Sequence, residues 1–240
     1  MSEPSMYAER ADLYDLIYSW KDYRREATRI RALLAAEGVA DGARLLEAAV
    51  GTGSHLVFLK DHYDANGFDL SQPMLEVARR KLPGIPLWRA DMASFTVTAP
   101  YDALVCLFSS IGYLRDAASL AGCAASFARA LVPGGALVVE PWFAPEAWTV
   151  GKPHVVHYAS EEIALARMCV SERKGELAVM DLHWLVGRRG GTVEHFVEHH
   201  ELWLCPHDRL VGAFRDAGFD VRYDPDGLQP GRGLVIGRKR

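Results

Sequence analysis

The stretch RLLEAAVGTG, Arg44–Gly53, decides the fold of this chain. Arg44–Val50 is a short apolar run with one acid inside it, which is typical of a buried strand. Gly51-Thr52-Gly53 follows as a turn, and helical character resumes over His55–Tyr63. The pattern is therefore strand, glycine turn and helix, the opening of a βαβ unit.

The same alternation continues for about a hundred residues on the carboxyl side of the turn. Ser71 has the character of an N-cap for the helix that follows it. Further strands are expected at Ala65–Leu70, Ile85–Arg89, Tyr101–Phe108 and Ala136–Glu140, with helices at Tyr23–Leu34, Gln72–Leu82 and Ala117–Leu131. Strands alternating with helices predict an α/β fold, a Rossmann-like, doubly wound and mostly parallel sheet.

The pattern changes after Pro141. Residues 154–204 show period-two character, with strands at Ala164–Val170, Ala178–Val186 and Val193–Leu204, which predicts an antiparallel β meander inserted into the α/β domain. A helix over Asp208–Ala217 and a closing hairpin at the sheet edge, Phe219–Tyr223 with Gly233–Gly237, are expected to follow. Residues 1–240 are thus predicted to form a single domain with an inserted subdomain.

Composition narrows the functional classes. The chain has 240 residues, with 31 acidic against 27 basic side chains and a net charge of −4. This balance argues against binding nucleic acid by bulk phosphate neutralisation. No apolar run approaches the roughly 20 residues that span a bilayer, and the polar start MSEPSMYAERADLYD lacks a signal-peptide pattern. The four cysteines form no Cys-x-x-Cys pair, so a cytoplasmic protein with reduced cysteines is expected.

Three acids follow consecutive strands and indicate a cofactor site. Asp69 ends the second strand, 18 residues after Gly51, where a carboxylate can accept both hydroxyls of a ribose. Asp91-Met92 follows the third strand, where an acid can accept from an adenine amino group and a thioether can lie on the ring. Glu47 would repel a pyrophosphate but suits an ammonium or a sulfonium, and S-adenosylmethionine (SAM) carries both. The alternative to a cofactor site is that Glu47 caps a helix and that Asp69 and Asp91 are solvated acids.

The motifs resemble those of class I SAM-dependent methyltransferases, and more closely those of the dTDP-aminosugar N,N-dimethyltransferases that make desosamine- and mycaminose-type sugars. The resemblance covers about Leu13 to Gly237. It rests on LYDLIY, KDY, LLEAAVGTG, DLSQPMLEVARRKLP, ADMASF, FSSIGYL, SFARALVPGGALVVEPWFAPE and GRGL. The glycine turn is common to the superfamily, whereas FSSIGYL and GRGL are much more specific. It implies a SAM-dependent enzyme that methylates the amine of a small molecule, most simply a nucleotide-linked aminosugar.

The sequence departs from the family pattern in several places. Glu47 and Val50 stand where the family usually has Asp and Cys, and Ser19-Trp20 replaces a Gly-rich stretch before KDY. Leu228-Gln229-Pro230 stands where Gly-Pro-Ser is usual. The first departure is conservative for SAM, while the others fall on the presumed acceptor side, to which the meander also belongs. Another amine or hydroxyl acceptor, or a SAM-binding regulatory protein without turnover, therefore remain alternatives.

Pattern and resemblance together give the candidate site residues. Those expected to bind the cofactor are Tyr14, Tyr23, Glu47, Ala49, Gly51, Gly53, Asp69, Leu70, Met74, Asp91, Met92 and Phe108. Those expected to bind the acceptor are Ser109, Ser110, Glu140, Trp142, His183 and Arg232. Arg232 is expected to bind the phosphates of the acceptor. Tyr14 and Tyr113 are the candidate catalytic residues. Tyr113 either receives or orients the amine proton, or only lines the cleft.

Two further expectations concern partners and metals. A homodimer is an open alternative to a monomer. His195, His199 and His200 cluster in the sequence, but a strand points His200 away from the other two, and no cysteine joins them at zinc spacing. No metal site is therefore expected.

Overall fold

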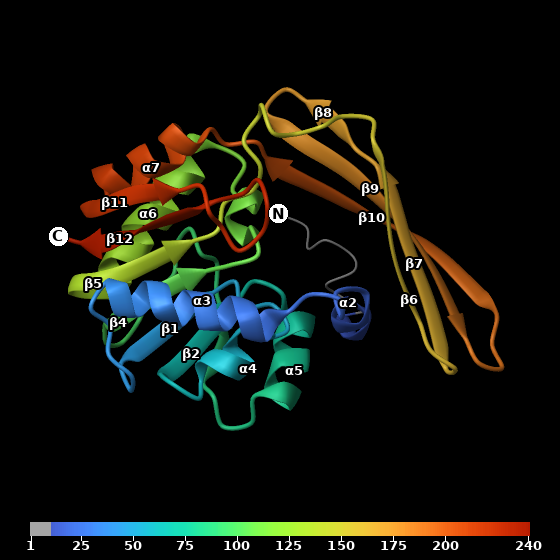
Figure 1. The fold of residues 1–240 in the computed structure, drawn as a ribbon, viewed down its shortest axis with the longest axis horizontal. Helices are drawn as coiled ribbons and strands as arrows, with labels where there is room; N and C mark the ends of the chain where they lie inside the picture. The colour runs from blue at the N-terminus through green and yellow to red at the C-terminus, as the bar shows by residue number, and fades with distance from the viewer. Residues whose placement is uncertain (1–10) are drawn as a thin grey trace.

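The computed structural model describes residues 11–240, and a seven-stranded sheet forms the centre of the molecule (Figure 1). Its order is β3-β2-β1-β4-β5-β12-β11. The first five strands are parallel, while β12 is antiparallel to both of its neighbours. The strands are β1 (Arg44–Ala48), β2 (Asp64–Asp69), β3 (Leu87–Arg89), β4 (Tyr101–Cys106), β5 (Leu131–Val139), β11 (Phe219–Asp224) and β12 (Leu234–Lys239). The predicted Rossmann-like α/β fold is confirmed.

Helices cover both faces of this sheet, and each face has its own apolar core. On one face lie α3 (Tyr23–Ala36), α4 (Leu56–Leu59) and α5 (Gln72–Lys81); on the other lie α6 (Ala117–Ala130) and α7 (His207–Asp216). Side chains fix where the helices begin: the Ser71 hydroxyl accepts from the Met74 N–H at 3.4 Å, as predicted for an N-cap. None of the helices in residues 11–240 is long and apolar enough to cross a membrane.

A second, antiparallel sheet extends away from the α/β body (Figure 1). Its order is β10-β9-β7-β6, and the short β8 pairs with β9. The strands are β6 (Pro153–Ala159), β7 (Ile163–Val170), β8 (Glu172–Lys174), β9 (Leu177–Arg188) and β10 (Val193–Trp203). The three strands named from sequence are present, and β6 and β8 are additional. Its inner face packs Trp184 and its neighbours on Leu13 and Ile17 of α2 (Ala11–Ile17), so α2 bridges the two sheets.

Two sequence expectations differ in detail. The helix expected over His55–Tyr63 is only α4, because residues 60–63 turn so that the Asp64 N–H reaches the Ala43 carbonyl at 3.0 Å and starts β2. The closing hairpin is present at the sheet edge as predicted, with β11 outermost, but its second strand, β12, begins and ends later than expected, at Leu234 and Lys239. β12 lies between β5 and β11, so the carboxyl end of the chain occupies an interior position of the sheet.

Candidate functional site

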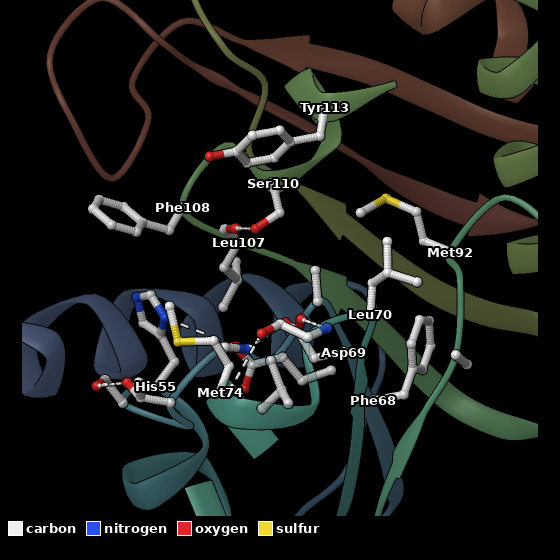
Figure 2. A pocket seen from close by; sticks show the side chains of 18 of the residues that line it. His55, Phe68, Asp69, Leu70, Met74, Met92, Leu107, Phe108, Ser110 and Tyr113 are labelled. Carbon is white, nitrogen blue, oxygen red and sulfur yellow. Dashed lines mark hydrogen bonds and ion pairs between the residues drawn. The ribbon is translucent and has the colours of Figure 1, made fainter. Parts of the chain in front are cut away.

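A pocket opens at the carboxyl ends of β1, β2 and β4, where the strand order reverses on either side of β1. Ligands of open α/β sheets bind at such switch points. Thirteen of the candidate residues line it: Tyr14, Tyr23, Glu47, Ala49, Gly51, Asp69, Leu70, Met74, Asp91, Met92, Phe108, Ser110 and Tyr113. Figure 2 shows Phe108, Ser110 and Tyr113 on one side of the pocket, across from His55, Met74 and Asp69.

The glycine turn and Asp69 are built as one unit. One Asp69 oxygen accepts the Gly51 N–H at 2.8 Å and the other accepts the Ser71 N–H at 2.8 Å. Gly51 has a φ of +56°, and a Cβ atom there would meet nothing within 4 Å, so its backbone faces open space in the pocket. Each carboxylate oxygen carries two lone pairs. Asp69 can therefore hold the turn and still accept a ligand hydroxyl.

Glu47 is the most unusual group in the pocket. It is 2% exposed, and its Oε2 atom has no hydrogen-bond partner in the described chain. Burial, together with the nearby Asp69 carboxylate, raises the pKa of Glu47 to about 8, while Lys81 opposes the shift. Its other oxygen lies 3.8 Å from His55 Nδ1. A buried carboxylate without a cation is unfavourable, so the site suits a ligand that brings a positive charge.

The opposite end of the pocket is more apolar. Phe68, Leu70 and Met92 line it, and Asp91 stands beside them with its Oδ1 accepting the Ala93 N–H at 2.9 Å. Apolar side chains beside an acceptor suit a heterocycle with an amino group. With Asp69 between the two ends, the pocket fits a ligand with an ammonium or sulfonium, a ribose and an adenine, and SAM has all of these.

Two non-glycine residues at the end of β4 have left-handed backbones, Phe108 with φ of +52° and Ser109 with φ of +62°. Such conformations persist only where the surroundings fix them. Here Glu140 Oε2 accepts the Phe108 N–H at 2.6 Å, and the Ser109 hydroxyl donates to the Pro141 carbonyl at 2.6 Å. Glu140 therefore holds the turn that presents the Phe108 ring to the pocket.

The amino-terminal helices cover the pocket with aromatic rings. Tyr14 of α2 lies edge-on to Phe108, with ring centroids 6.4 Å apart, and Tyr23 lies edge-on to His55 at 4.9 Å. Burial raises the pKa of both phenols well above the usual range, so both stay neutral at any physiological pH. Asp15 of α2 fastens this cover, because it accepts from Lys81 at 2.7 Å and from Thr52 at 2.6 Å.

A buried ionic cluster joins the cover to the carboxyl-terminal loop. Glu26 Oε2 accepts from His55 Nε2 at 2.7 Å, and Glu26 Oε1 accepts from Lys21 and from Gln229 Nε2, the latter at 2.9 Å. Burial works against an ionised Glu26, but the hydrogen bonds from His55 and Lys21 outweigh it and hold the pKa of Glu26 below its usual value. No local sequence pattern indicates that these four residues meet.

Sequence reasoning also missed the neighbour of Tyr113. The Tyr113 hydroxyl, at the end of the 3₁₀ helix η1 (Ser110–Tyr113), lies 2.8 Å from His200 Nδ1 on β10. The period-two pattern does place His200 on the buried face, opposite His195 and His199. That alternation was the available signal, and it does not tell which distant residue the buried face meets.

Six candidates do not line the pocket. Gly53 packs against α5, where a Cβ atom would lie 2.5 Å from Leu82 Cδ1. Ser109 and Glu140 are buried beneath the turn at Phe108 and do not line the pocket. His183 is on the exposed face of the antiparallel sheet, stacked on His195. Trp142 and Arg232 lie together outside the pocket, with the guanidinium carbon 4.8 Å from the Trp142 ring centroid.

Arg232 is held by internal contacts. Its Nη1 donates to the Ser109 hydroxyl at 3.1 Å and lies 3.9 Å from Glu140 Oε1, while its Nε has no partner in residues 11–240. Burial lowers the pKa of Arg232, and Glu140 opposes that shift. Within the same residues no group of three or more His, Cys, Asp or Glu side chains is arranged to hold a metal ion.

Comparisons with known proteins agree with this site. A family model described as a methyltransferase domain matches residues 45–135. The chain is 38% identical, over 95% of its length and 97% of the relative, to dTDP-3-amino-3,4,6-trideoxy-alpha-D-glucopyranose N,N-dimethyltransferase of Streptomyces venezuelae. It is 32% identical, over 97% and 94%, to dTDP-4-amino-2,3,4,6-tetradeoxy-D-glucose N,N-dimethyltransferase of Saccharopolyspora spinosa.

Solved structures give the same result. The crystal structure of Streptomyces venezuelae DesVI matches with a TM-score of 0.91 and 36% identity, covering 97% of this chain and 99% of that one. SAM-bound CalS10, an amino pentose methyltransferase of Micromonospora echinaspora, matches with a TM-score of 0.85 and 32% identity, covering 95% and 97%. With its carboxylate-lined pocket at the switch point, this chain is a SAM-dependent methyltransferase and belongs to the family of dTDP-aminosugar N,N-dimethyltransferases.

Proposed function

We propose that this enzyme transfers methyl groups from SAM to the amine of a nucleotide-linked aminosugar. The observation that carries the proposal is similarity over nearly the whole chain to relatives named as dTDP-aminosugar N,N-dimethyltransferases, at 38% identity over 95% of the chain. Two relatives differ in the position of the amine, at C3 in one name and at C4 in the other. The proposal therefore commits to the class of acceptor and leaves the amine position to experiment.

The residues that would hold SAM bind and align it rather than activate it. SAM supplies an electrophilic methyl group on a sulfonium. Glu47 would pair with its ammonium, Asp69 would accept its ribose hydroxyls, and Asp91 would accept from its adenine. A neutral amine attacks well once it is aligned and water is excluded, and the rings of Tyr14 and Phe108 form an apolar wall for that purpose.

On the acceptor side, Arg232 is the proposed phosphate ligand. Its guanidinium is ringed by Phe108, Trp142 and Phe143, with its carbon 5.8, 4.8 and 5.1 Å from the three ring centroids. A planar guanidinium can donate hydrogen bonds to two phosphate oxygens at once, but here it would have to exchange its contact with Ser109 for them. His183 lies on the outer face of the antiparallel sheet, so its position gives the predicted substrate contact no support.

The test is a methylation assay with purified enzyme and SAM. The acceptors are a dTDP-3-aminosugar, a dTDP-4-aminosugar and the same sugars without nucleotide, and mass spectrometry counts the methyl groups added. The proposal expects one or two methyl groups on at least one nucleotide-linked amine. Turnover only of nucleotide-free amines or of hydroxyls would replace it with another small-molecule methyltransferase. Tight SAM binding without any turnover would favour a regulatory protein.

We also infer that two copies associate through the outer face of the antiparallel sheet. Val155, Met168, His183 and Val197 form one row across its four long strands, and the three apolar members are 53%, 53% and 41% exposed. Leu185 extends this apolar face and is 49% exposed. Contiguous apolar patches of this kind mark protein interfaces. Light scattering should give a dimer for the wild type and a monomer for Met168→Glu, with Lys174→Glu on β8 as the control that stays dimeric.

A further inference from the structure

A line of polar groups runs from the pocket into the core of the antiparallel sheet. It starts at Tyr113, whose hydroxyl is 2.8 Å from His200 Nδ1. The other ring nitrogen of His200 lies 3.6 Å from Glu198 Oε2. Trp184 Nε1 donates to that same oxygen at 2.8 Å. The pocket is thereby connected to a buried carboxylate through a phenol and an imidazole.

Glu198, His200 and Trp184 are buried, and removing their polar groups from water is unfavourable for folding. Glu198 and Trp184 are 0% exposed and His200 is 4% exposed. A carboxylate in such a place is unfavourable unless it is paired with a positive charge. The Trp184 N–H is a neutral donor to one oxygen, and Glu198 Oε1 has no hydrogen-bond partner in the described residues. An imidazolium at His200 would supply the missing charge.

Methyl transfer in the proposed function leaves the product nitrogen protonated, and this N–H proton must pass to an acceptor. When the neutral nitrogen forms its bond to the methyl carbon, the carbon–sulfur bond breaks and its electron pair stays on sulfur. The nitrogen is then an ammonium with one proton too many, and it cannot attack again until that proton leaves. An acceptor that arrives protonated must lose a proton before the first transfer as well.

We propose that Tyr113, His200 and Glu198 form a proton-accepting chain for the acceptor amine. The ammonium N–H gives its proton to the Tyr113 oxygen as the Tyr113 hydroxyl proton moves to His200 Nδ1. Tyr113 is left unchanged, the nitrogen regains its lone pair, and His200 becomes an imidazolium facing Glu198. This inference rests on the proposed function for its substrate, and within it His200 and Glu198 act through Tyr113 as positioning residues.

The chain requires one tautomer of His200 before the reaction. Nδ1 must be unprotonated to receive the Tyr113 hydroxyl, so the proton must sit on Nε2, toward Glu198. Other ionisable groups near the chain come from three elements. Tyr14 on α2 couples electrostatically to Tyr113, Arg115 follows η1, and Glu201 on β10 pairs with Arg115 at 2.8 Å. The charges of Arg115 and Glu201 compensate each other.

The kinetic test compares His200→Gln with His199→Gln. His199 is the next residue but faces solvent, paired with Asp181 at 2.7 Å, so it is a matched control. At pH 7 His200→Gln should lower kcat about 10²–10⁴-fold, the usual contribution of a positioned base, with SAM affinity unchanged. Without the base, His200→Gln can methylate only acceptor molecules whose amine is already neutral in solution. The ratio of wild-type to variant kcat should therefore fall about tenfold per pH unit up to the pKa of the acceptor amine.

Two more variants distinguish a chain from a packing contact. Tyr113→Phe should show the same loss and the same pH profile, and the double variant should lose no more than either single one, because the groups act as a unit. Glu198→Gln keeps an acceptor oxygen for Trp184 and provides a second measurement if His200→Gln folds poorly. A loss for His200→Gln that does not change with pH, or one that His199→Gln shares, would overturn the proposal.

A readout without turnover completes the test. Nitrogen-15 NMR of the histidine rings should show His200 protonated at Nε2 in the wild type and altered in Tyr113→Phe. A His200 protonated at Nδ1 would overturn the chain whatever the acceptor. If the wild type methylates no nucleotide-linked aminosugar, the proposed function fails by itself, and the same variants can be measured on whichever amine accepts methyl.

Discussion

Replacing Glu47 with glutamine should make the protein more stable and its cofactor affinity weaker. Glu47 is 2% exposed, and burial with the nearby Asp69 raises its pKa from 4.5 to about 8. At 1.36 kcal/mol for each unit of pKa, that difference corresponds to about 5 kcal/mol at alkaline pH. The ionised side chain is therefore a large unfavourable contribution to the free energy of folding in the absence of SAM.

The sign of the pH dependence follows from proton counts. Between about pH 4.5 and pH 8 the folded chain keeps a proton on Glu47 that the unfolded chain releases. The free energy of unfolding therefore falls as the pH rises through that window. Glutamine has no such proton, so Glu47→Gln should match the wild type near pH 4 and exceed it at pH 9 by up to about 5 kcal/mol. Urea denaturation at a series of pH values measures this difference.

Cofactor binding should show the opposite effect. The SAM ammonium favours the ionised carboxylate, so the wild type should release a proton on binding below pH 8 and bind more tightly as the pH rises toward 8. Glu47→Gln should bind SAM about 10–150-fold more weakly, which corresponds to the loss of one charge-assisted contact of roughly 1.5–3 kcal/mol, and should release no proton at this site. Calorimetry in two buffers with different ionisation enthalpies counts the protons.

A control and a refuting result complete the experiment. Asp102 lies at the far end of β4, where its Oδ2 accepts the Arg44 N–H at 2.8 Å. Asp102→Asn should leave SAM affinity and proton release unchanged. If Glu47→Gln keeps the wild-type slope of stability against pH, Glu47 does not titrate as described. If it releases the same number of protons on binding SAM, Glu47 does not meet the cofactor ammonium.

Three further predictions use the same pocket. Asp69→Ala leaves the Gly51 and Ser71 N–H groups without their acceptor, so it should lower the free energy of unfolding by about 1–3 kcal/mol. It should also weaken SAM binding at least tenfold, and an unchanged calorimetric affinity would remove the ribose assignment. Gly51→Ala and Gly53→Ala should both lower the melting temperature, because both positions have positive φ, and Gly53→Ala should lower it more because of its contact with Leu82. Gly51→Ala should in addition weaken SAM binding, since its methyl group enters the pocket; equal effects on affinity would contradict this division. Arg232→Ala should raise KM about 30–150-fold for a nucleotide-linked aminosugar but not for the free sugar, and Arg232→Lys should recover only part; equal losses for both acceptors would mean that Arg232 holds Glu140 and not a phosphate.

The convergence of many candidate residues on one pocket could be predicted from the sequence. Hydrophobic periodicity placed the parallel strands, and the carboxyl ends of parallel strands meet at one edge of a sheet. Acids at the carboxyl ends of consecutive strands, such as Glu47, Asp69 and Asp91, therefore converge on one pocket regardless of details of packing. That inference needs only local pattern and topology.

The residues that were missed depend on contacts between distant elements. His200 alternates correctly onto the buried face of β10, but its partner Tyr113 is 87 positions earlier, in a different sheet's loop. The GRGL motif predicts that Arg232 is a phosphate ligand, but the motif does not reveal the aromatic rings and Glu140 that bury it. Gly53 shares a motif with Gly51, yet only the packing of α5 reveals that it faces Leu82 and not the ligand.

The interior position of β12 sets the order in which this enzyme is completed during synthesis. The edge of β5 has no strand partner until Leu234–Lys239 have left the ribosome, and Gln229, which fastens Glu26, emerges only shortly before them. Until then the nascent chain presents an open sheet edge, a feature that promotes pairing with other chains. A chain that stops before Leu234 would leave one edge of β5 exposed and β11 without a partner, so early termination should prevent completion of the sheet even though the residues that line the pocket all lie in the first half of the chain.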